Sequence, residues 1–361
     1  MEMALYGPGG FFTTGRGAGR RADFLTSPEV GPLFGAVLSR ALDVEWERLG
    51  RPDPFVVVEV GAGRGALARA VLGSEPAAEG ALRYVCVERS PLLRAEVEAR
   101  LPCEPAAFVL GSAQRGDGDD AAPATSGAGP VVAVLDDVPV GPVTGVVVAN
   151  ELLDNLPFRL LERHERGWAE VLVGQAEPGA DDLRQFAEII VDAPADLAVE
   201  GERLAPVAAP GARIPVQRAA DRWLRRSLEL LQRGRLVVID YADTTASLAR
   251  RPWRQWIRTY RGQDRGGHPL DDPGGQDITC EVALDQLATV RRPDADRSQA
   301  VWLRRHGIDE LVGVARTTWR ERAHLGDLTA LAARSRVGEG DALLDPAGLG
   351  AFRVLEWELG R

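Results

Sequence analysis

Three glycines at alternate positions, Gly61, Gly63 and Gly65, follow a run of β-branched residues, and the acid Glu59 stands two places before the first of them. Residues 55–60 are typical of a strand buried on both faces, and glycines after such a strand let the backbone come very close to a ligand. A nicotinamide dinucleotide loop has the spacing G-x-G-x-x-G, with its third glycine one residue later. The spacing G-x-G-x-G therefore predicts an S-adenosylmethionine (SAM) loop, and it makes a dehydrogenase the weakest alternative.

A second acid, Glu88, ends the next apolar run at residues 82–87. In a doubly wound sheet, an acid at this position accepts hydrogen bonds from ribose hydroxyls. The bland alternative is that the glycines serve only a tight turn. That alternative is the weaker one, because the glycine spacing and the acid at position 88 together point to a cofactor.

Further polar residues, Asn150, Glu151 and Asp154, follow the apolar run at residues 146–149. The C-terminal end of a central strand is where open α/β sheets carry out chemistry. Because Glu151 and Asp154 are three residues apart, a helical turn would bring them to one face. Such a pair is a candidate catalytic site. The alternatives are a cap for Asp154 and a solvated face for Glu151, and the spacing alone does not decide between them.

The elements that hold these residues alternate between strands and helices, which is typical of an α/β fold with a mostly parallel sheet and helices on both faces. A helix is expected from Ala66, and Ser90 with Pro91 opens another that ends near Pro102. The other expected elements are a helix at 218–232, a buried strand at 235–239 that ends at Asp240, a helical region at about 301–334 and a terminal strand pair around 352–355.

The N-terminal region contains a helix start within a loop. Ser27 is expected as the N-cap and Pro28 as the first helical residue, with one helix then running through Phe34 to Trp46. On sequence physics alone, Thr26 to Glu29 are no more than this helix start.

With 361 residues, the chain is expected to form one core fold that carries insertions. We divide it into an N-terminal capping segment (1–50), the first part of a cofactor-binding core (51–157), an insertion (158–215), and a part that completes the core and the substrate side (216–361). The insertion alternates short strand-like runs with turns and has no long helical period. Residues 111–130 are almost without apolar side chains and are expected to form a mobile surface loop.

The composition excludes several classes of protein. All 43 basic residues are arginine, which excludes a Walker-type nucleotide loop and a Schiff-base enzyme, since both need lysine. A formal net charge of −10 argues against a nucleic-acid partner. Cys86, Cys103 and Cys280 are not spaced for zinc or a disulfide framework, so we predict no metal site and a reduced, cytoplasmic location. No apolar run approaches the roughly 18 residues of a membrane span, and no signal peptide opens the chain, so membrane insertion is not expected.

Taken in order, these pieces resemble the MidA family of SAM-dependent methyltransferases, which includes the mitochondrial complex I assembly methyltransferase and its bacterial relatives. The resemblance spans nearly the whole chain and implies a class I methyltransferase fold, with a Rossmann-like sheet and an inserted substrate-side region. It is carried by these runs: Leu5-Tyr6 with Gly10-Phe11-Phe12, Asp23-Phe24-Leu25-Thr26-Ser27-Pro28-Glu29, Glu59-Val60-Gly61-Ala62-Gly63-Arg64-Gly65, Glu88-Arg89-Ser90-Pro91, Asn150-Glu151-Leu152-Leu153-Asp154-Asn155-Leu156-Pro157, Asp240-Tyr241, Tyr260-Arg261 and Gln276-Asp277-Ile278-Thr279.

The resemblance also implies the site and the acceptor. The residues implied for the cofactor are Thr26, Pro28, Glu59, Gly61, Gly63, Gly65, Glu88, Arg89, Ser90 and Asn150, and those implied for catalysis are Asn150, Glu151, Asp154 and Asp240. The implied reaction is methylation of a protein arginine, as on a respiratory complex I subunit. A small-metabolite methyltransferase and a non-catalytic SAM-binding assembly factor are the alternatives, and the intact acids count against the second. The oligomeric state is left open, with a homodimer among the candidates.

The chain departs from the family pattern on the substrate side. Gln263 and Glu281 stand where the family tends to carry histidines, and Ala22 and Ala242 stand where it often has glycine. These departures bear on the acceptor more than on the cofactor. The first residues match the inside of the family's first helix, so the native start is expected upstream of Met1.

Overall fold

The computed structural model describes residues 1–16, 26–110, 127–176, 185–262 and 264–360. Its centre is a seven-stranded sheet in the order β15-β16-β9-β4-β1-β2-β3. The neighbouring parallel strands are β3 (Val131–Leu135), β2 (Leu82–Val87), β1 (Phe55–Val60), β4 (Val143–Asn150) and β9 (Leu231–Asp240). β16 (Arg353–Leu359) runs antiparallel to β9 and to the short β15 (Ala295–Ser298). The predicted mostly parallel α/β sheet is confirmed.

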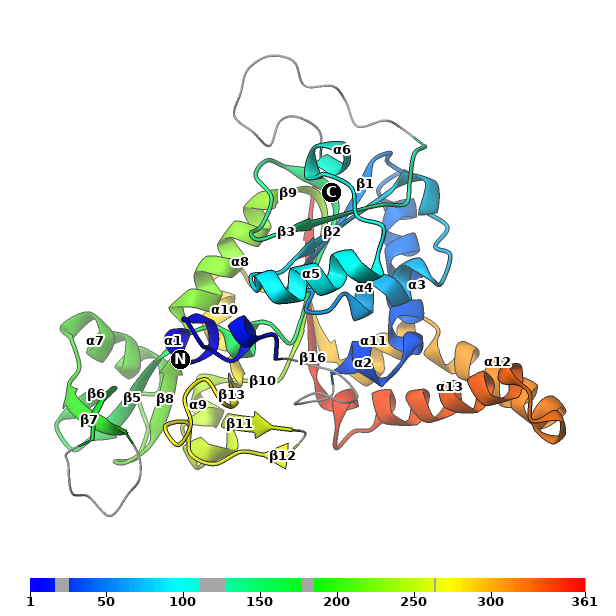
Figure 1. Cartoon of the computed structure of the whole chain (residues 1–361). Helices are drawn as coiled ribbons and strands as arrows, with labels where there is room; N and C mark the ends of the chain where they lie inside the picture. The colour runs from blue at the N-terminus through cyan, green and yellow to red at the C-terminus, as the bar shows by residue number, and fades with distance from the viewer. Residues whose placement is uncertain (17–25, 111–126, 177–184, 263, 361) are drawn as a thin grey trace.

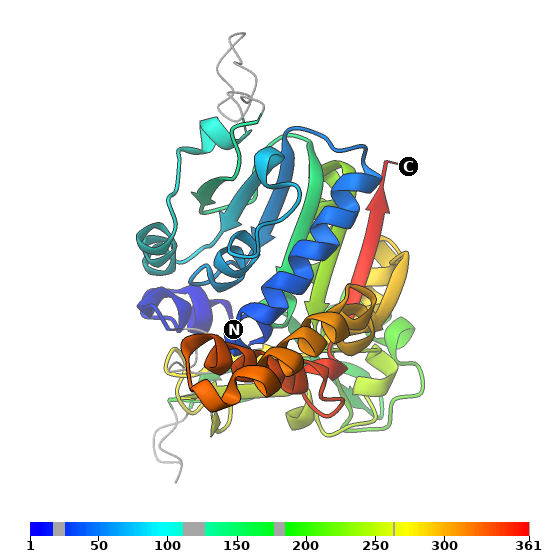
Figure 2. The same ribbon diagram turned by 90° about the vertical axis from the view of Figure 1, so that its right-hand side faces the viewer.

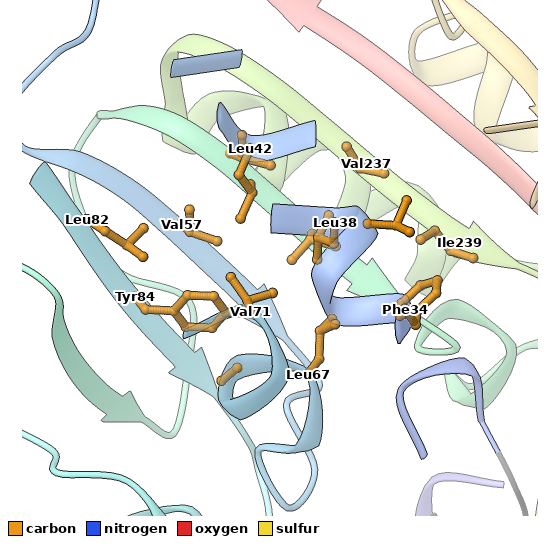
Figure 3. Close-up of a cluster of buried hydrophobic side chains, with 14 of the residues drawn as sticks. Phe34, Leu38, Leu42, Val57, Leu67, Val71, Leu82, Tyr84, Val237 and Ile239 are labelled. Carbon is orange, nitrogen blue, oxygen red and sulfur yellow. The ribbon is translucent and has the colours of Figure 1, made fainter. Parts of the chain in front are cut away.

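Both faces of this sheet are covered by helices, because successive residues of a buried strand point to opposite sides. Phe55 and Val57 of β1 belong to one core with α3 (Pro32–Arg48) and α4 (Ala66–Leu72). Val56, Val58 and Val60 belong to a second core with α8 (Arg218–Leu230) and α10 (Leu284–Val290). Figure 2 shows α3 lying across the sheet, and Figure 3 shows its apolar side chains over β1 and β9. All six residues of β1 are buried, as its β-branched run predicts.

The strand order reverses at β1, since β2 lies on one side of it and β4 on the other. The chain passes from β1 outward to β2 and β3 and then returns to β4. In open α/β sheets, a ligand crevice forms outside the carboxyl ends of the strands at such a reversal. The acids and glycines singled out in the sequence follow β1, β2 and β4, so the fold gathers them at this crevice.

A second lobe lies at the carboxyl ends of the strands, beside the N-terminal helix α1 (Glu2–Tyr6) (Figure 1). It contains an antiparallel sheet in the order β7-β6-β5-β8. The strands are β5 (Arg159–His164), β6 (Gly167–Gln175), β7 (Phe186–Asp192) and β8 (Arg213–Val216), and the helix α7 (Ala195–Leu204) packs on them. The expectation of short strand-like runs without a long helical period in residues 158–215 misses α7. The three buried residues of this helix have helical spacing, but one of them is Gly201, so only Leu197 and Leu204 supply an apolar signal.

Smaller elements complete the second lobe and the core. They are η1 (Phe12–Thr14), η2 (Glu79–Ala81), α5 (Pro91–Arg100), α6 (Ala106–Leu110), η4 (Leu153–Asn155), β10 (Ala242–Asp243), α9 (Thr245–Leu248), η5 (Trp253–Gln255), β11 (Ile257–Arg261), β12 (Asp264–Arg265), β13 (Asp277–Cys280) and β14 (Val282–Ala283). β12, β11 and β13 form a three-stranded sheet, and β10 pairs with β14. The expected loop at 111–130 lies mostly outside the described residues, as do Ala22 and Gln263.

The N-terminal helix differs from its prediction. Two helices replace one, α2 (Ser27–Val30) and α3, with Gly31 between them, and the N-cap of α2 is Thr26 rather than Ser27. Only glycine fits at the break, because a side chain at Gly31 would come within 2.1 Å of the Glu339 carboxyl carbon. Glu339 in turn accepts a hydrogen bond from the N–H of Leu33 at 2.9 Å, in the first turn of α3.

The C-terminal region is largely helical, as predicted, but longer. It contains α11 (Gln299–Arg305), α12 (Ile308–Arg322), η6 (Ala323–Leu325), α13 (Leu328–Leu344) and η7 (Leu349–Ala351). The strand predicted around 352–355 is confirmed as β16, but its predicted terminal partner is not, because β16 pairs with β9 and β15. Among the described residues, we find no helix with the length and apolar character needed to span a bilayer.

Candidate active site

A cleft of about 710 Å³ opens at the carboxyl ends of β1, β2 and β4. Nine of the predicted site residues line it: Thr26, Pro28, Glu59, Gly61, Gly63, Glu88, Arg89, Asn150 and Glu151. Four others are not part of the lining that the described residues form: Gly65, Ser90, Asp154 and Asp240. The structure therefore brings the glycine loop and the carboxylate segment to one cavity, with the start of α2 as a further wall.

The loop after β1 is held against the end of β2. The N–H groups of Gly61 and Ala62 donate to the carbonyl of Val87, at 2.8 and 3.0 Å. Gly61 and Gly63 have φ of 78° and 54°, in the left-handed region that favours glycine. A side chain at Gly61 would approach Leu152 to 3.0 Å, whereas one at Gly63 would meet no described protein atom within 4 Å. Position 63 thus faces open space, where a ligand can lie directly against the backbone.

Glu88 closes this loop from the side of β2. Its carboxylate accepts hydrogen bonds from the N–H of Gly63 at 2.9 Å and of Ser90 at 2.8 Å. Burial raises the pKa of Glu88, although these N–H groups favour the ionised form. Ser90 caps α5, accepting from the N–H of Leu93 and donating to the carbonyl of Phe12. Ser90 therefore supports Glu88 from behind, and its contact with the cofactor stays a prediction.

Glu59 stands between the core and the cleft. It lies on the β1 face that packs on α4, and the hydroxyl of Tyr84 donates to it at 2.8 Å. Burial raises the pKa of Glu59 to about 8, because hydrogen bonds from Tyr84 and the backbone of Ala68 only partly stabilise its charge. A cationic group of a ligand would stabilise the charged form of such a buried carboxylate.

Glu151, the first residue after β4, has φ of 51°. A left-handed conformation costs a non-glycine residue about 1–2 kcal/mol, and such strain is concentrated at functional sites. The N–H of Glu151 donates to the carbonyl of Ile239 at 2.8 Å, which holds the strained turn. Its carboxylate accepts from Asn150 Nδ2 at 3.1 Å and from the N–H of Ser27 at 3.4 Å. Burial and the nearby charge of Asp154 raise the pKa of Glu151 to about 8.

The helical turn predicted to carry both acids is absent. The 3-10 helix η4 begins at Leu153, so Glu151 precedes it. The physical reason is that Asp240 Oδ2 takes the N–H groups of Leu153 and Asp154, at 3.0 and 3.3 Å, and folds the turn around itself. Glu151 and Asp154 are nevertheless close enough for Asp154 to raise the pKa of Glu151.

Asp154 and Asp240 lie behind the cleft wall, with 3% and 2% of their surface exposed. Asp240 also accepts from the N–H of Tyr241 at 2.8 Å, so it positions the chain that carries Asp154. Burial raises the pKa of Asp154 to about 7, and burial together with Asp154 raises that of Asp240. Oδ1 of Asp154 has no hydrogen-bond partner among the described residues. A buried acceptor in this state is suited to a donor that arrives with a substrate.

The sequence reasoning did not assign a role to Tyr6, Asn155 or Asp277, although all three lie in the runs that carry the family resemblance. Asn155 Nδ2 donates to Asp277 Oδ1 at 3.0 Å and to the carbonyl of Ile278 at 3.1 Å. The Tyr6 hydroxyl donates to the carbonyl of Asn155 at 3.3 Å, and the guanidinium of Arg89 lies 4.6 Å from the Tyr6 ring centroid. These contacts join the N-terminal segment and the second lobe to residues 151–155, which we call the turn of acids because they contain Glu151 and Asp154.

A further group of lining residues was missed because β3 was not predicted. Asp136 and Asp137 follow β3 and line the cleft together with Trp223 and Arg226 of α8. Arg226 Nη1 donates to both carboxylate oxygens of Asp137 at 2.9 Å. The signal that could have found this wall is the five-residue apolar run at 131–135.

The seven-stranded order, the glycine loop after β1 and the acid after β2 define a class I SAM-dependent methyltransferase. The residues fit SAM. Gly63 leaves open space against the loop, Glu88 stands where ribose hydroxyls are bound, and the cleft has the volume of a cofactor site. Glu59, Gly61, Gly63 and Glu88 are the residues that would hold the cofactor.

A family model described as "Putative S-adenosyl-L-methionine-dependent methyltransferase" matches residues 37–300, and the chain belongs to this family. A Drosophila melanogaster relative, named protein arginine methyltransferase NDUFAF7 homolog, is 33% identical over 193 residues, which are 53% of this chain and 44% of the relative. The chain thus spans less than half of that protein. The NDUFAF7 of Mus musculus is 26% identical over 337 residues, 86% of this chain and 70% of the relative. A COG1565 superfamily member from Burkholderia thailandensis, crystallised with S-adenosyl-homocysteine, has a TM-score of 0.75 at 27% identity, covering 99% of this chain and 86% of that chain.

Proposed function

We propose that this chain transfers the methyl group of SAM to an arginine side chain of a protein. One observation carries the proposal: Glu151 lines the cleft at a strained turn, and the buried Asp154, three residues further on, has an oxygen without a hydrogen-bond partner among the described residues. Burial raises the pKa of both acids, and the charge of Asp154 raises that of Glu151 further, so a cation near them would stabilise their charged forms. The guanidinium group is a planar cation with a fork of donors that matches carboxylates.

The names of the relatives support the same acceptor. The fruit-fly and mouse proteins are both named protein arginine methyltransferases. Following the family resemblance, we extend the proposal to a subunit of respiratory complex I where the host has that complex. The three cysteines are free thiols, which fits the cytoplasmic location that we propose.

The bound cofactor supplies a methyl group on a positively charged sulfur, so the protein must mainly align the acceptor and exclude water. In the transfer, an N–C bond forms at the guanidinium while the S–C bond breaks, and one guanidinium proton must leave. Glu151 is placed to accept that proton, and Asn150 orients Glu151 through their 3.1 Å hydrogen bond. Asp154 lies behind the cleft wall, so its negative charge acts on the guanidinium from there, and Asp240 positions the turn that carries Asp154.

The test uses the purified chain with methyl-tritiated SAM and a protein extract from its own cells. After acid hydrolysis of the labelled protein, we expect the label in methylarginine. Label that appears in a small molecule instead, or in no species at all, contradicts the proposal. Gly63→Val serves as the control, because label that persists with this cofactor-site variant would come from a contaminating enzyme.

The complex I target has a separate test. We expect peptide mass spectrometry of purified complex I to show a methylated arginine that is lost when the gene is deleted and returns with the wild-type gene. The same methylation in the deletion strain would remove complex I from the proposal. The arginine acceptor itself would still rest on the labelling experiment.

A further inference from the structure

The strand β7 is an edge of the second-lobe sheet, and three of its four exposed side chains are apolar, the fourth being Asp192. Ile189 and Ile190 are each 45% exposed, Val191 is 37% exposed, and the neighbouring Leu172 and Val173 of β6 are 41% and 58% exposed. Sheet edges are normally blunted by charge, because an open apolar edge pairs with other chains. Figure 1 shows this sheet at one end of the molecule, away from the seven-stranded core.

One of the two edges of the main sheet, β15, provides a contrast. β15 carries Asp296 and Arg297, and each is held in an ion pair, with Arg353 and with Glu356. This edge has the charged character that discourages pairing with another chain. The comparable charge on β7, Glu188, is already bound by Arg213 through two hydrogen bonds of 2.9 and 2.7 Å. The charges of β7, Glu188 and the exposed Asp192, thus flank a run of three exposed apolar residues, 189–191, whereas β15 carries its charges at its two central positions.

The ladder between β6 and β7 tells which backbone groups of β7 face outward. The N–H of Ala193 donates to Trp168, and that of Ala176 donates to Gln185, in the same register as the Leu172–Ile189 pair. In an antiparallel pair, hydrogen-bonded residues alternate with non-bonded ones. The odd-numbered residues of β7 therefore bond to β6, and the even-numbered ones direct their N–H and C=O groups away from it. Among the described residues, no other strand pairs with β7.

We propose that β7 is a homodimer interface, in which the β7 strands of two copies pair antiparallel about a two-fold axis at Ile189. The outward N–H and C=O groups of Glu188 then pair with those of Ile190 of the partner subunit. The two-fold axis repeats this pairing, so the groups of Ile190 pair with those of Glu188 of the partner subunit. The two four-stranded sheets become one sheet of eight strands. A two-fold contact must use the same patch on both copies. An antiparallel pair of β7 strands meets this requirement, because both copies contribute the same residues.

The charges on β7 select this axis over its neighbours. With the axis at Ile189, Glu188 lies opposite Ile190 of the partner subunit, and Phe186 lies opposite Asp192 of the partner subunit. An axis at Ile190 would set Glu188 opposite Asp192 of the partner subunit, and an axis at Glu188 would set two glutamates face to face. Like charges directly opposite each other destabilise a strand pair. Only the axis at Ile189, of these three, avoids such a pair.

Cross-linking of the full chain tests the register. Residues that face each other in a non-hydrogen-bonded pair have Cα atoms about 4.5 Å apart, within the range of a disulfide. In a Cys103→Ser background, we expect Ile189→Cys to give a covalent dimer under mild oxidation. Ile190→Cys is a matched control of equal exposure, and it should stay monomeric in denaturing electrophoresis, because it faces Glu188 of the partner subunit. Cross-linking at position 190 in place of 189 would overturn the proposed pairing.

Light scattering and sedimentation test the dimer itself, without any measurement of activity. We expect a concentration-dependent dimer for the wild type, and a dissociation constant raised about tenfold or more by Ile189→Glu, which brings two charges together on the axis. Val207→Glu adds the same charge at a site that is 89% exposed and lies outside β7, and it should leave the dimer unchanged. A wild type that stays monomeric up to hundreds of micromolar, or a dimer that Ile189→Glu does not weaken, would overturn the proposal.

Discussion

At the residue scale, Asp154 and Glu151 divide the chemistry between a buried acceptor and a carboxylate on the cleft wall. Asp154→Asn keeps the shape of the side chain and removes its charge. If this acid holds the acceptor, methyl transfer should fall by about 10²–10⁴-fold while the affinity for SAM stays nearly constant. Steady-state labelling and calorimetry measure the two quantities. Asp327→Asn, which alters the N-cap of α13, is the control that should keep full turnover.

Unchanged turnover in Asp154→Asn would leave this acid with a structural role only. Its buried hydrogen bonding would then account for its place in the fold. A parallel loss of SAM binding would mean that the substitution had disturbed the cleft as a whole. Only a loss of transfer at constant affinity supports the proposed division.

Gly63 carries the second prediction at this scale. Gly63→Val places a branched side chain in the open space of the loop, so SAM binding should become undetectable by calorimetry. The backbone strain of valine at positive φ must be separated from contact with the ligand. Gly50→Val provides that control, because Gly50 has φ of 84°, no described protein atom near its missing side chain, and a position at the far end of α3. SAM affinity that is equal in both variants would contradict the assignment of the loop.

At the element scale, the break between α2 and α3 positions the start of α2, where the N–H of Ser27 donates to Glu151. In Gly31→Ala the new methyl group must displace the Glu339 carboxylate, which also accepts from Leu33. We expect a loss of about 1–3 kcal/mol in the free energy of unfolding, measured in denaturant, since a buried N–H loses its partner. In the Glu339→Ala background the same substitution should cost much less, because the obstacle is gone. Equal costs in the two backgrounds would show that Glu339 does not cause the break.

The sequence predicts those elements whose determinants are local. The apolar runs of β1, β2, β4 and β9 predict their strands, and the glycine loop is placed by its spacing alone. Three features were not predicted. Two of them depend on contacts far along the chain, since Gly31 lies against Glu339 and β16 pairs with β9. The third, α7, has only two buried apolar side chains and so gives a weak local signal.

The candidate site shows the same division between local and distant determinants. The residues at the ends of β1, β2 and β4 were predicted, because the carboxyl ends of parallel strands meet at one edge of a sheet. The relation between Glu151 and Asp154 was predicted with the wrong geometry. A helical turn explains their spacing in sequence, whereas the structure uses a strained turn held by Asp240 and Ile239. That arrangement depends on β9, which lies far along the chain.

At the scale of the whole molecule, buried carboxyl groups make the stability depend on pH. The pKa of Glu59 is raised from its ordinary value to about 8 in the folded protein. Between about pH 5 and pH 8 the folded chain therefore holds a proton that the unfolded chain has lost, so the free energy of unfolding falls as pH rises. One such group contributes a slope of up to about 1.4 kcal/mol per pH unit.

Glu59→Gln isolates this contribution. Glutamine cannot ionise, so the difference in unfolding free energy between variant and wild type should shift in favour of the variant as the pH rises through this window. Denaturant unfolding at several pH values measures it, with Glu310→Gln, an exposed acid, as the control. A difference that does not change with pH would mean that Glu59 is ionised in the folded protein.

The hydrogen bonds around the turn of acids join parts of the chain that are made at very different times. Asp240 bonds to Leu153 across 87 positions, Asn155 to Asp277 across 122, and Ser27 to Gln299 across 272. While the ribosome is still extending the chain, the glycine loop and Glu88 can already fold, since they depend on neighbouring strands. The turn of acids can fold only after the segments that enclose it have been synthesised. A nascent chain would thus acquire its cofactor loop early and its methyl-transfer chemistry only near the end of synthesis.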